Sequence, residues 1–130
     1  MALIEEARET LTTPVYFDYD QSAITPQARR VLESKAEILR ASPQVRLRLE
    51  GHADERGSNE YNLALGNRRA ESVLNFFTSF GLQGNRFSTV SYGEERPAVD
   101  ESNEEAWAQN RRVEFVITAG RNQINPAAEE

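Results

Sequence analysis

Hydrophobic and polar positions alternate along short segments of the chain, and each such pattern predicts a β-strand. Residues 45–50 read Val-Arg-Leu-Arg-Leu-Glu, with apolar side chains at every second position, which is the period of a half-buried strand. Further β-prone runs stand at residues 15–17, 87–92 and 112–117. Alternation, in place of continuous apolar runs, predicts a sheet with one face in solvent and the other face covered.

Apolar positions recur at helical spacing in two longer segments. The first begins at Thr25–Pro26, a hydroxyl N-cap followed by a proline whose missing N–H costs nothing there, and it ends before Ser42. The second covers residues 59–80 and ends at Gly81, which we expect to be a C-cap glycine. A short helix is expected over residues 100–109.

The order of elements is therefore β-α-β-α-β-(α)-β. Helices that cross between strands favour right-handed βαβ units in a mixed sheet. We expect an α/β (α+β) fold, a two-layer sandwich with helices packed on one face of a mixed four-stranded sheet. A chain of 130 residues has the usual size of one domain. We expect that domain at residues 14–119, after a tail or short acidic helix at residues 1–13 and before a flexible tail at residues 120–130.

The composition excludes several classes of function. Hydrophobic content of 38% and charged content of 28% are typical of a globular protein. A net charge of −6 and a pI near 4.9 disfavour general binding to nucleic acid or to an anionic membrane, because phosphate binding needs a basic field. The chain has no cysteine, which excludes disulfides, thiol catalysis and thiolate metal sites but not an oxidising compartment.

The first residues of this sequence do not have the pattern of a targeting signal. No apolar run is long enough to span a bilayer, and the first ten residues lack the basic and apolar regions of a signal peptide. We therefore expect either a cytoplasmic protein or a sequence that begins after a removed leader.

The strongest candidate for binding chemistry is a pair of opposite charges. Asp54 lies in a loop bounded by Gly51 and Gly57, and Arg69 lies on the helix that follows. Asn62, seven residues before Arg69, projects from the same stripe of that helix. A fixed carboxylate and a fixed guanidinium near a cleft suit a zwitterionic ligand. The structural alternatives are that Asp54 satisfies loop amides and that the other two side chains make local pairs or caps.

Two further segments carry candidate residues. Arg111 stands at the entrance of the last predicted strand, where loop residues often bind ligands. The Asp18–Tyr19–Asp20 turn either presents backbone amides to an anion or serves only as a turn. Arg112 and Glu114 share one face of the last strand, which predicts an ion pair between them.

The sequence offers little for catalysis. His52 is the only histidine, and no His, Asp or Glu at a suitable spacing marks a metal site around it, so we expect neither a metal ligand nor a general base there. No phosphate loop, nucleophile elbow or zinc motif is present. We expect a binding module that is not an enzyme and has no cofactor.

Five blocks of sequence, in order, resemble the OmpA-like peptidoglycan-binding domain over about Val15 to Ala119. Within that family, the sequences of three of the blocks are most similar to those of the lipid-anchored outer-membrane members that work with the Tol proteins. The blocks are FDYD at residues 17–20, GHADERG at 51–57, EYNLALGNRRA at 60–70, SYGEERP at 91–97 and NRRVEF at 110–115.

The resemblance implies a two-layer α/β domain that binds the peptidoglycan stem peptide without covalent chemistry, mainly through its diaminopimelate residue. In that case Asp54 holds the diaminopimelate ammonium and Arg69 holds the adjacent carboxylate. Asn62 lines the same pocket, Arg111 lies beside it, and the backbone of the turn Asp18 to Asp20 helps to close the site.

The same resemblance implies a place at the periplasmic side of the outer membrane, a lipid anchor on an N-terminal cysteine that this chain lacks, and TolB and other Tol proteins as partners. Two alternatives remain open. One is the wall-binding domain of a porin or a flagellar stator, and the other is a peptidoglycan hydrolase. The hydrolase would pair Asp54 with one of three glutamates, Glu50, Glu55 or Glu60.

Overall fold

The computed structural model describes residues 2–126, which form one mixed sheet with helices on one side. The strand order is β1-β4-β2-β3. Strands β2 and β3 are parallel, and β1 and β2 each pair antiparallel with β4. The expected four-stranded mixed sheet is confirmed. The strands are β1 (Val15–Tyr16), β2 (Arg46–His52), β3 (Phe87–Gly93) and β4 (Arg112–Ala119).

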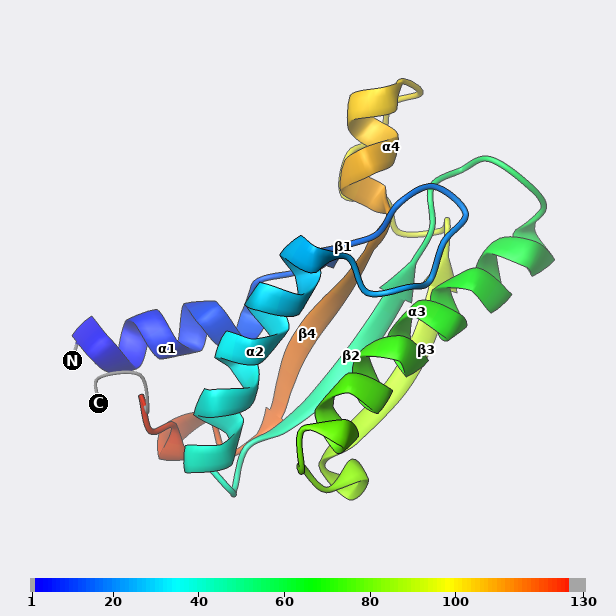
Figure 1. The fold of residues 1–130 in the computed structure, drawn as a ribbon. Helices are drawn as coiled ribbons and strands as arrows, with labels where there is room; N and C mark the ends of the chain where they lie inside the picture. Colours follow the sequence, from blue (N-terminus) through cyan, green and yellow to red (C-terminus); the bar gives the residue numbers. More distant parts are fainter. Residues whose placement is uncertain (1, 127–130) are drawn as a thin grey trace.

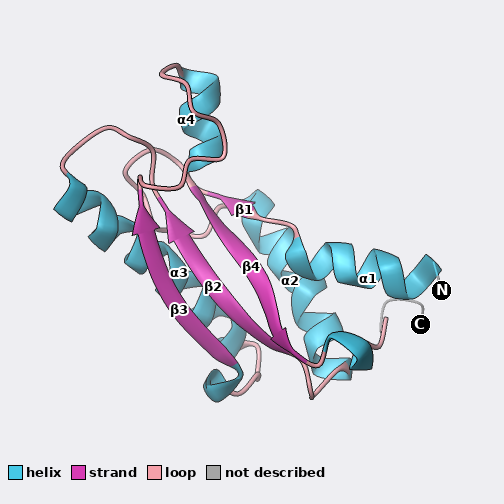
Figure 2. Ribbon diagram, turned by 180° about the vertical axis from the view of Figure 1, so that it is seen from behind, coloured by secondary structure: helices cyan, strands magenta, loops and turns pink. Residues whose placement is uncertain are grey.

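Helices α2 and α3 cover one face of the sheet (Figure 1), and the opposite face is not covered by a helix (Figure 2). Helix α4 projects beyond one end of the sheet and is not part of the helical layer. The two-layer arrangement with one open face is therefore as expected. The helices are α1 (Ala2–Thr12), α2 (Pro26–Ala41), α3 (Asn59–Ser79) and α4 (Glu104–Asn110), with short 3-10 turns at Gly84–Arg86 and Arg121–Gln123.

Side-chain caps set where the helices begin. The Thr25 hydroxyl accepts a hydrogen bond from the third residue of α2, as its sequence predicts, and Ser58 does the same for α3. In α4 the cap is Asn103, whose Oδ1 accepts from the Ala106 N–H at 2.8 Å. The expected start of this helix near residue 100 was therefore four residues too early. Gly81, with a φ of 100°, follows α3 as the expected C-cap glycine.

Two glycines bring α3 directly against β2, and this contact positions the loop between them. A Cβ atom on Gly51 would lie 1.8 Å from the carbonyl oxygen of Gly66, so no larger residue fits at that crossing. The loop that connects the two elements, residues 53–58, consequently leaves the end of the sheet right beside the first turns of α3.

Lys35, the chain's only lysine, is buried in the interior. Its Nζ donates to the carbonyls of Thr10, Leu11 and Thr13 at 2.6, 3.0 and 2.5 Å. Thr10 and Leu11 lie in the last turn of α1 and Thr13 follows it, where carbonyls lack the i→i+4 hydrogen bonds of the helix interior. Lys35 thus fastens α1 to α2.

Both ends of the described chain dock on the core. Within the segment expected as a tail or short helix at residues 1–13, Ala2–Thr12 form helix α1, whose Leu11 is fully buried, and Met1 lies outside the described residues. The expectation of a flexible tail from residue 120 is wrong for its first part, because Ile124 is buried in the core and Asn125 N–H bonds to Ser42 Oγ at 2.8 Å. Residues 127–130 of that expected tail lie outside the described residues. Within residues 2–126 no helix has the length and hydropathy needed to cross a membrane.

Candidate binding site at the Asp54 loop

A cavity of about 130 Å³ lies where the loop after β2 meets the loop after β1 and the start of α3. Four of the residues predicted for the site, namely Tyr19, Asp20, Asp54 and Asn62, line it together. They come from three separate segments of the chain, which the sheet brings to one end. The remaining lining residues are Ala53, Arg56, Gly57, Tyr61 and Leu65.

Asp54 is the acidic centre of this cavity and is only 4% exposed. Its Oδ1 accepts hydrogen bonds from the N–H and Nε of Arg56 at 3.0 and 3.1 Å, and its Oδ2 accepts from Arg56 Nη2 at 2.9 Å. The Nη1 of Arg111 lies 3.9 Å from Oδ2. Burial raises the pKa of Asp54, but the hydrogen bonds and charge of Arg56, with the charge of Arg111, hold that pKa below its ordinary value. The carboxylate is therefore ionised at neutral pH.

Arg56 is a site residue that the sequence analysis did not single out. Its guanidinium carbon lies 3.9 Å from the centre of the Tyr19 ring and 4.0 Å from the centre of the Trp107 ring. Two aromatic contacts and a bidentate bond to Asp54 fix its position at the cavity. The signal that could have found it is the Asp-x-Arg spacing, because an aspartate commonly accepts from the backbone two residues later.

Arg69 is not among the residues that line the cavity, although the resemblance implies that it holds the ligand carboxylate. The side chain is fully buried, and each of its three nitrogen atoms donates a hydrogen bond to a backbone carbonyl. Nε bonds to Gln21 O at 2.8 Å, Nη2 to Asp18 O at 3.1 Å and Nη1 to His52 O at 2.8 Å. Burial lowers the pKa of Arg69 to about 10, so the guanidinium stays charged at neutral pH. Arg69 ties the loop after β1 to the end of β2.

The loop at residues 18–21 presents carbonyls to the interior, whereas one of the two interpretations of its sequence was that it presents amides to an anion. The carbonyls of Asp18 and Gln21 point to Arg69, as described above. Asp20 has a φ of 58°, a left-handed conformation that costs free energy for a residue other than glycine. Its carboxylate accepts a hydrogen bond from the Tyr61 hydroxyl. The loop is therefore strained at Asp20.

Asn62 and Arg111 flank the cavity in different ways. Asn62 is buried on the first turn of α3, and its Nδ2 donates to Glu94 Oε1 at 2.5 Å. Arg111 is 8% exposed and donates through Nε to the Phe17 carbonyl at 2.8 Å. Its Nη1 also reaches Glu104 Oε2 at 3.4 Å. Arg111 therefore adds positive charge behind Asp54 without lining the cavity.

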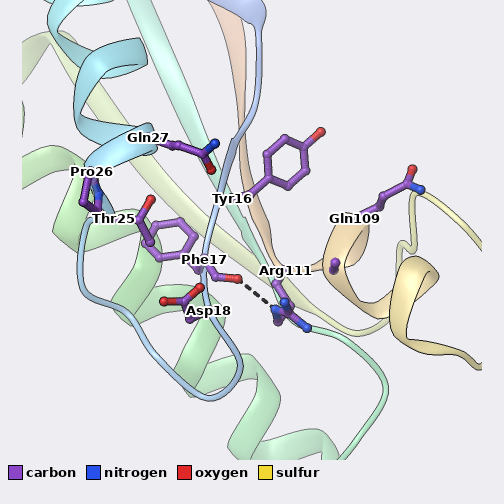
Figure 3. Close-up of a pocket in the computed structure, with 9 residues that line it drawn as sticks. Tyr16, Phe17, Asp18, Thr25, Pro26, Gln27, Gln109 and Arg111 are labelled. Atoms are coloured by element: carbon purple, nitrogen blue, oxygen red, sulfur yellow. Dashed lines mark hydrogen bonds between the residues drawn. The ribbon is translucent and has the colours of Figure 1, made fainter.

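A larger groove of about 600 Å³ lies between the segment after β1, the start of α2 and the end of α4 (Figure 3). Asp18 and Arg111 are its charged lining residues, and Figure 3 shows Arg111 already bonded to the Phe17 carbonyl. The groove is therefore large enough for a ligand, but it does not offer a free carboxylate and a free cation together, as a zwitterion would need. Its lining is Tyr16, Phe17, Asp18, Thr25, Pro26, Gln27, Ala108, Gln109 and Arg111.

Comparison with known proteins assigns the chain to a family. Residues 16–111 match the model of the OmpA family. A peptidoglycan-associated lipoprotein of Pseudomonas aeruginosa is 47% identical over 114 residues, which cover 88% of this chain and 67% of that protein.

Solved structures agree with the sequence comparison. The peptidoglycan-associated lipoprotein of Burkholderia pseudomallei superposes with a TM-score of 0.78 at 39% identity, over 81% of this chain and 89% of that one. The C-terminal domain of Helicobacter pylori MotB gives a TM-score of 0.77 at 25% identity, over 85% of this chain and 87% of that one. The fold expected from the sequence is therefore the fold of these neighbours, and the resemblance stated from five sequence blocks is confirmed: the chain belongs to the OmpA family.

Proposed function

We propose that this chain binds peptidoglycan without covalent chemistry, through the diaminopimelate residue of the stem peptide, at the Asp54 cavity. The observation that carries the proposal is that Asp54 and Arg69 both have partners within the chain. The partner of Asp54 is a cation, as the ligand ammonium is, and the partners of Arg69 are a pair of oxygen acceptors, as the ligand carboxylate is. Arg56 occupies the Asp54 carboxylate as a cation would. Two loop carbonyls occupy the outer edge of Arg69 as a carboxylate would.

Binding of the ligand ammonium is an exchange at Asp54. The diaminopimelate ammonium takes a carboxylate oxygen that Arg56 now holds, while Arg56 stays beside the cavity between its two aromatic neighbours. The charge of the carboxylate is neutralised before and after the exchange. The net gain is accordingly smaller than that of a bare ion pair, because one charge-assisted hydrogen bond replaces another.

Binding of the ligand carboxylate is an exchange at Arg69. The Nε and Nη2 atoms form the edge that grips a carboxylate with two parallel hydrogen bonds, and in this structure they bond instead to Gln21 O and Asp18 O. We propose that the loop at residues 18–21 moves aside and that the carboxylate replaces both carbonyls. The strain at Asp20 favours this opening, and an ionised acceptor binds a guanidinium more strongly than neutral carbonyls do.

This exchange explains how a wall with diaminopimelate would be preferred to one with lysine at the same stem position. Lysine lacks the second carboxylate, so it offers nothing to replace the two loop carbonyls. Arg69 then keeps its internal partners and the loop stays closed. The guanidinium of Arg69 has hydrogen-bond acceptors with either ligand. Selectivity arises because only diaminopimelate gains the binding free energy of a carboxylate on Arg69.

The relatives suggest where the domain works. Those reported above at 39% and 47% identity are named peptidoglycan-associated lipoproteins, whereas the MotB domain is 25% identical. We propose that this chain likewise tethers the outer membrane to the wall from the periplasmic side, by an N-terminal lipid anchor, with TolB and other Tol proteins as partners. The higher identity favours this setting over a stator or a porin.

A hydrolase is disfavoured by the surroundings of the acids. None of the three candidate glutamates is among the residues that line the Asp54 cavity. Glu50 is bonded to Arg48, and Glu55 accepts from Trp107 Nε1 at 2.9 Å. A general acid and base must both reach the reacting atoms, which these side chains do not do. If purified sacculi release soluble fragments when incubated with the protein, the proposal of a binding module is wrong.

Calorimetric titration with a diaminopimelate-containing muropeptide, and with its lysine counterpart, tests the proposal. We expect Asp54→Asn and Arg69→Ala each to weaken binding of the diaminopimelate form by about 30-fold or more, because one partner of a desolvated charge pair is removed. Wild type should bind the lysine form as weakly as Arg69→Ala binds either form.

Two matched variants serve as controls. Asp100→Asn removes the same charge at an exposed position outside the cavity, and Arg86→Ala removes another arginine that donates to interior carbonyls, those of Ser42 and Val45. We expect Arg86→Ala to lose stability without losing affinity. Equal affinity of Asp54→Asn and Asp100→Asn would refute the assignment of the ammonium site.

A further inference from the structure

Three potential metal ligands meet on the open face of the sheet, away from the residues that line the Asp54 cavity. Glu50 and His52 lie on β2 and Glu114 lies on β4, with one ligand atom of each within 4.8 Å of the others. The register places Glu50 directly opposite Glu114, and His52 follows Glu50 on the same face of β2. Two carboxylates directly opposite each other destabilise a sheet unless cations compensate them.

His52 has buried polar atoms without partners. The side chain is 1% exposed, and among residues 2–126 neither Nδ1 nor Nε2 has a hydrogen-bond partner. A buried ring nitrogen without a partner costs free energy and calls for an unseen water or ion. Burial first, and the charge of Arg112 second, lower the pKa of His52 to about 4. At neutral pH the imidazole is therefore neutral, which is the form that binds metals.

The two glutamates are oriented by arginines and keep oxygens for another ligand. Arg48 Nε donates to Glu50 Oε2 at 2.8 Å, and Arg112 Nε donates to Glu114 Oε2 at 2.6 Å. Both bonds go to Oε2, which leaves the Oε1 atoms for a further partner. Hydrogen bonds of this kind, from an outer group to a ligating carboxylate, orient the ligands in metal sites. The side chain of Glu114 is 38% exposed, so an ion can enter beside it.

We propose that Glu50, His52 and Glu114 bind a divalent transition-metal ion, with Zn²⁺ as the best match, through one ring nitrogen and one carboxylate oxygen from each glutamate. An imidazole with carboxylates suits zinc, whereas Ca²⁺ and Mg²⁺ prefer oxygen ligands alone. Ligand atoms around zinc lie roughly 3.3 Å apart, given metal–ligand distances of about 2.0–2.2 Å. The ligand atoms lie within 4.8 Å of one another here, so binding would require rotation of the glutamate side chains, of which Glu114 is partly exposed.

Nearby positive charge limits the affinity. Arg48 and Arg112 contact the two glutamates, and Arg96 lies over the ring of Tyr92, which is itself beside His52. A cation with only electrostatic attraction to the site would be disfavoured by these arginines. The nitrogen–metal bond to His52 is what favours a transition metal here, and replacing a glutamate should therefore weaken binding without changing the preference among metals.

Nuclear magnetic resonance of the imidazole nitrogens tests this site directly, because the chain has one histidine and hence one imidazole. We expect one equivalent of ZnCl₂ added to untagged protein to shift one His52 nitrogen resonance, to saturate at 1:1 and to be reversed by EDTA. Zinc should also raise the melting temperature of the wild type. Unchanged His52 resonances at one equivalent of zinc would overturn the proposal.

A pair of glutamate variants separates a built site from general binding to acids. We expect Glu114→Gln to weaken zinc binding by about 10-fold or more, as loss of a ligand or its support does. Glu71→Gln, exposed on α3, makes the same change of charge away from the cluster and should bind zinc as the wild type does. Equal zinc affinity of the two variants would contradict the site. Glu114→Gln should keep its affinity for the diaminopimelate muropeptide in EDTA. A failure of the proposed zinc site can therefore be distinguished from a failure of the proposed wall binding.

Discussion

Asp54 and Arg69 each already bond to a partner within the chain, and this governs the energetics of binding. Their partners are Arg56 for the carboxylate and the loop carbonyls of Asp18 and Gln21 for the guanidinium. In the proposed exchange each ligand contact replaces an internal one, so affinity is a difference between two similar interactions. A planar guanidinium suits this role, because its fork bonds equally to two carbonyls or to one carboxylate.

The low pKa of Asp54 leads to a prediction about pH. Because Arg56 and Arg111 hold that pKa below its ordinary value, the carboxylate stays charged well into the acid range. We expect muropeptide affinity to be constant from about pH 7 to about pH 5, where amino groups also stay protonated. The contribution of Asp54 to stability should be present above its unfolded pKa and lost as pH falls through the lower folded value.

Calorimetry at a series of pH values, in buffers of constant ionic strength, checks this prediction. Asp100→Asn should follow the wild-type curve. A fall in affinity with a midpoint above pH 5 would show that the group that binds the ammonium has a raised pKa, and Asp54 would then not be that group.

The sequence identifies which residue types form the site but not where their side chains point. Asp54 and Asn62 line the cavity as expected, because the loop and the first turn of α3 are local features. The direction of Arg69 depends on the backbone of a distant loop, which no periodicity reveals. The same holds for His52: its glutamate neighbour on β4 is brought beside it by strand register, and without that register the sequence showed no metal site.

At the level of elements, local signals set the strands and the two long helices, and distant contacts set the rest. Alternation predicted β2, and the Thr25 cap predicted the start of α2. The docking of Ile124 and of α1 depends on residues far away in the sequence. The local sequence of α1, which is acidic, and that of the polar segment after Gly120 therefore did not predict it. The hydrogen bonds of Lys35 to the carbonyls at residues 10–13 likewise depend on contacts distant in the sequence.

Replacing Lys35 tests how α1 is held. We expect Lys35→Met to destabilise the domain by about 3 kcal/mol, because the ammonium satisfies three carbonyls at the negative end of the α1 dipole. Burial lowers the pKa of Lys35 to about 7, and those carbonyls together with the Phe115 ring, 4.0 Å from Nζ, favour the charged form against that shift. Urea unfolding gives the change in stability.

Hydrogen exchange locates the effect of the same variant. Protection of the α1 amides should fall in Lys35→Met while the amides of β2 and β4 keep most of their protection. Arg40→Met, which removes a cation from an exposed position at the end of α2, should leave α1 protected. Equal protection of α1 in wild type and Lys35→Met would mean that apolar packing alone holds the helix.

For the whole molecule, the topology gathers the site from segments far apart in sequence. Pairing of Tyr16 with Arg112 and of Gly51 with Val113 places the loop after β1, the loop after β2 and the start of β4 at one end of the sheet (Figure 1). The pattern of elements predicted this two-layer arrangement. The proposed ligand rests on the family resemblance, because composition and charge exclude classes of partner but do not identify one.

A crystal structure of the chain with a bound diaminopimelate-containing stem peptide is the most direct test of how the wall is recognised. We expect the ligand ammonium on the Asp54 carboxylate, the ligand carboxylate on Nε and Nη2 of Arg69, and the carbonyls of Asp18 and Gln21 displaced from that arginine. A complex in which the peptide lies elsewhere, or in which Arg69 still bonds to both loop carbonyls, would contradict the proposed exchange.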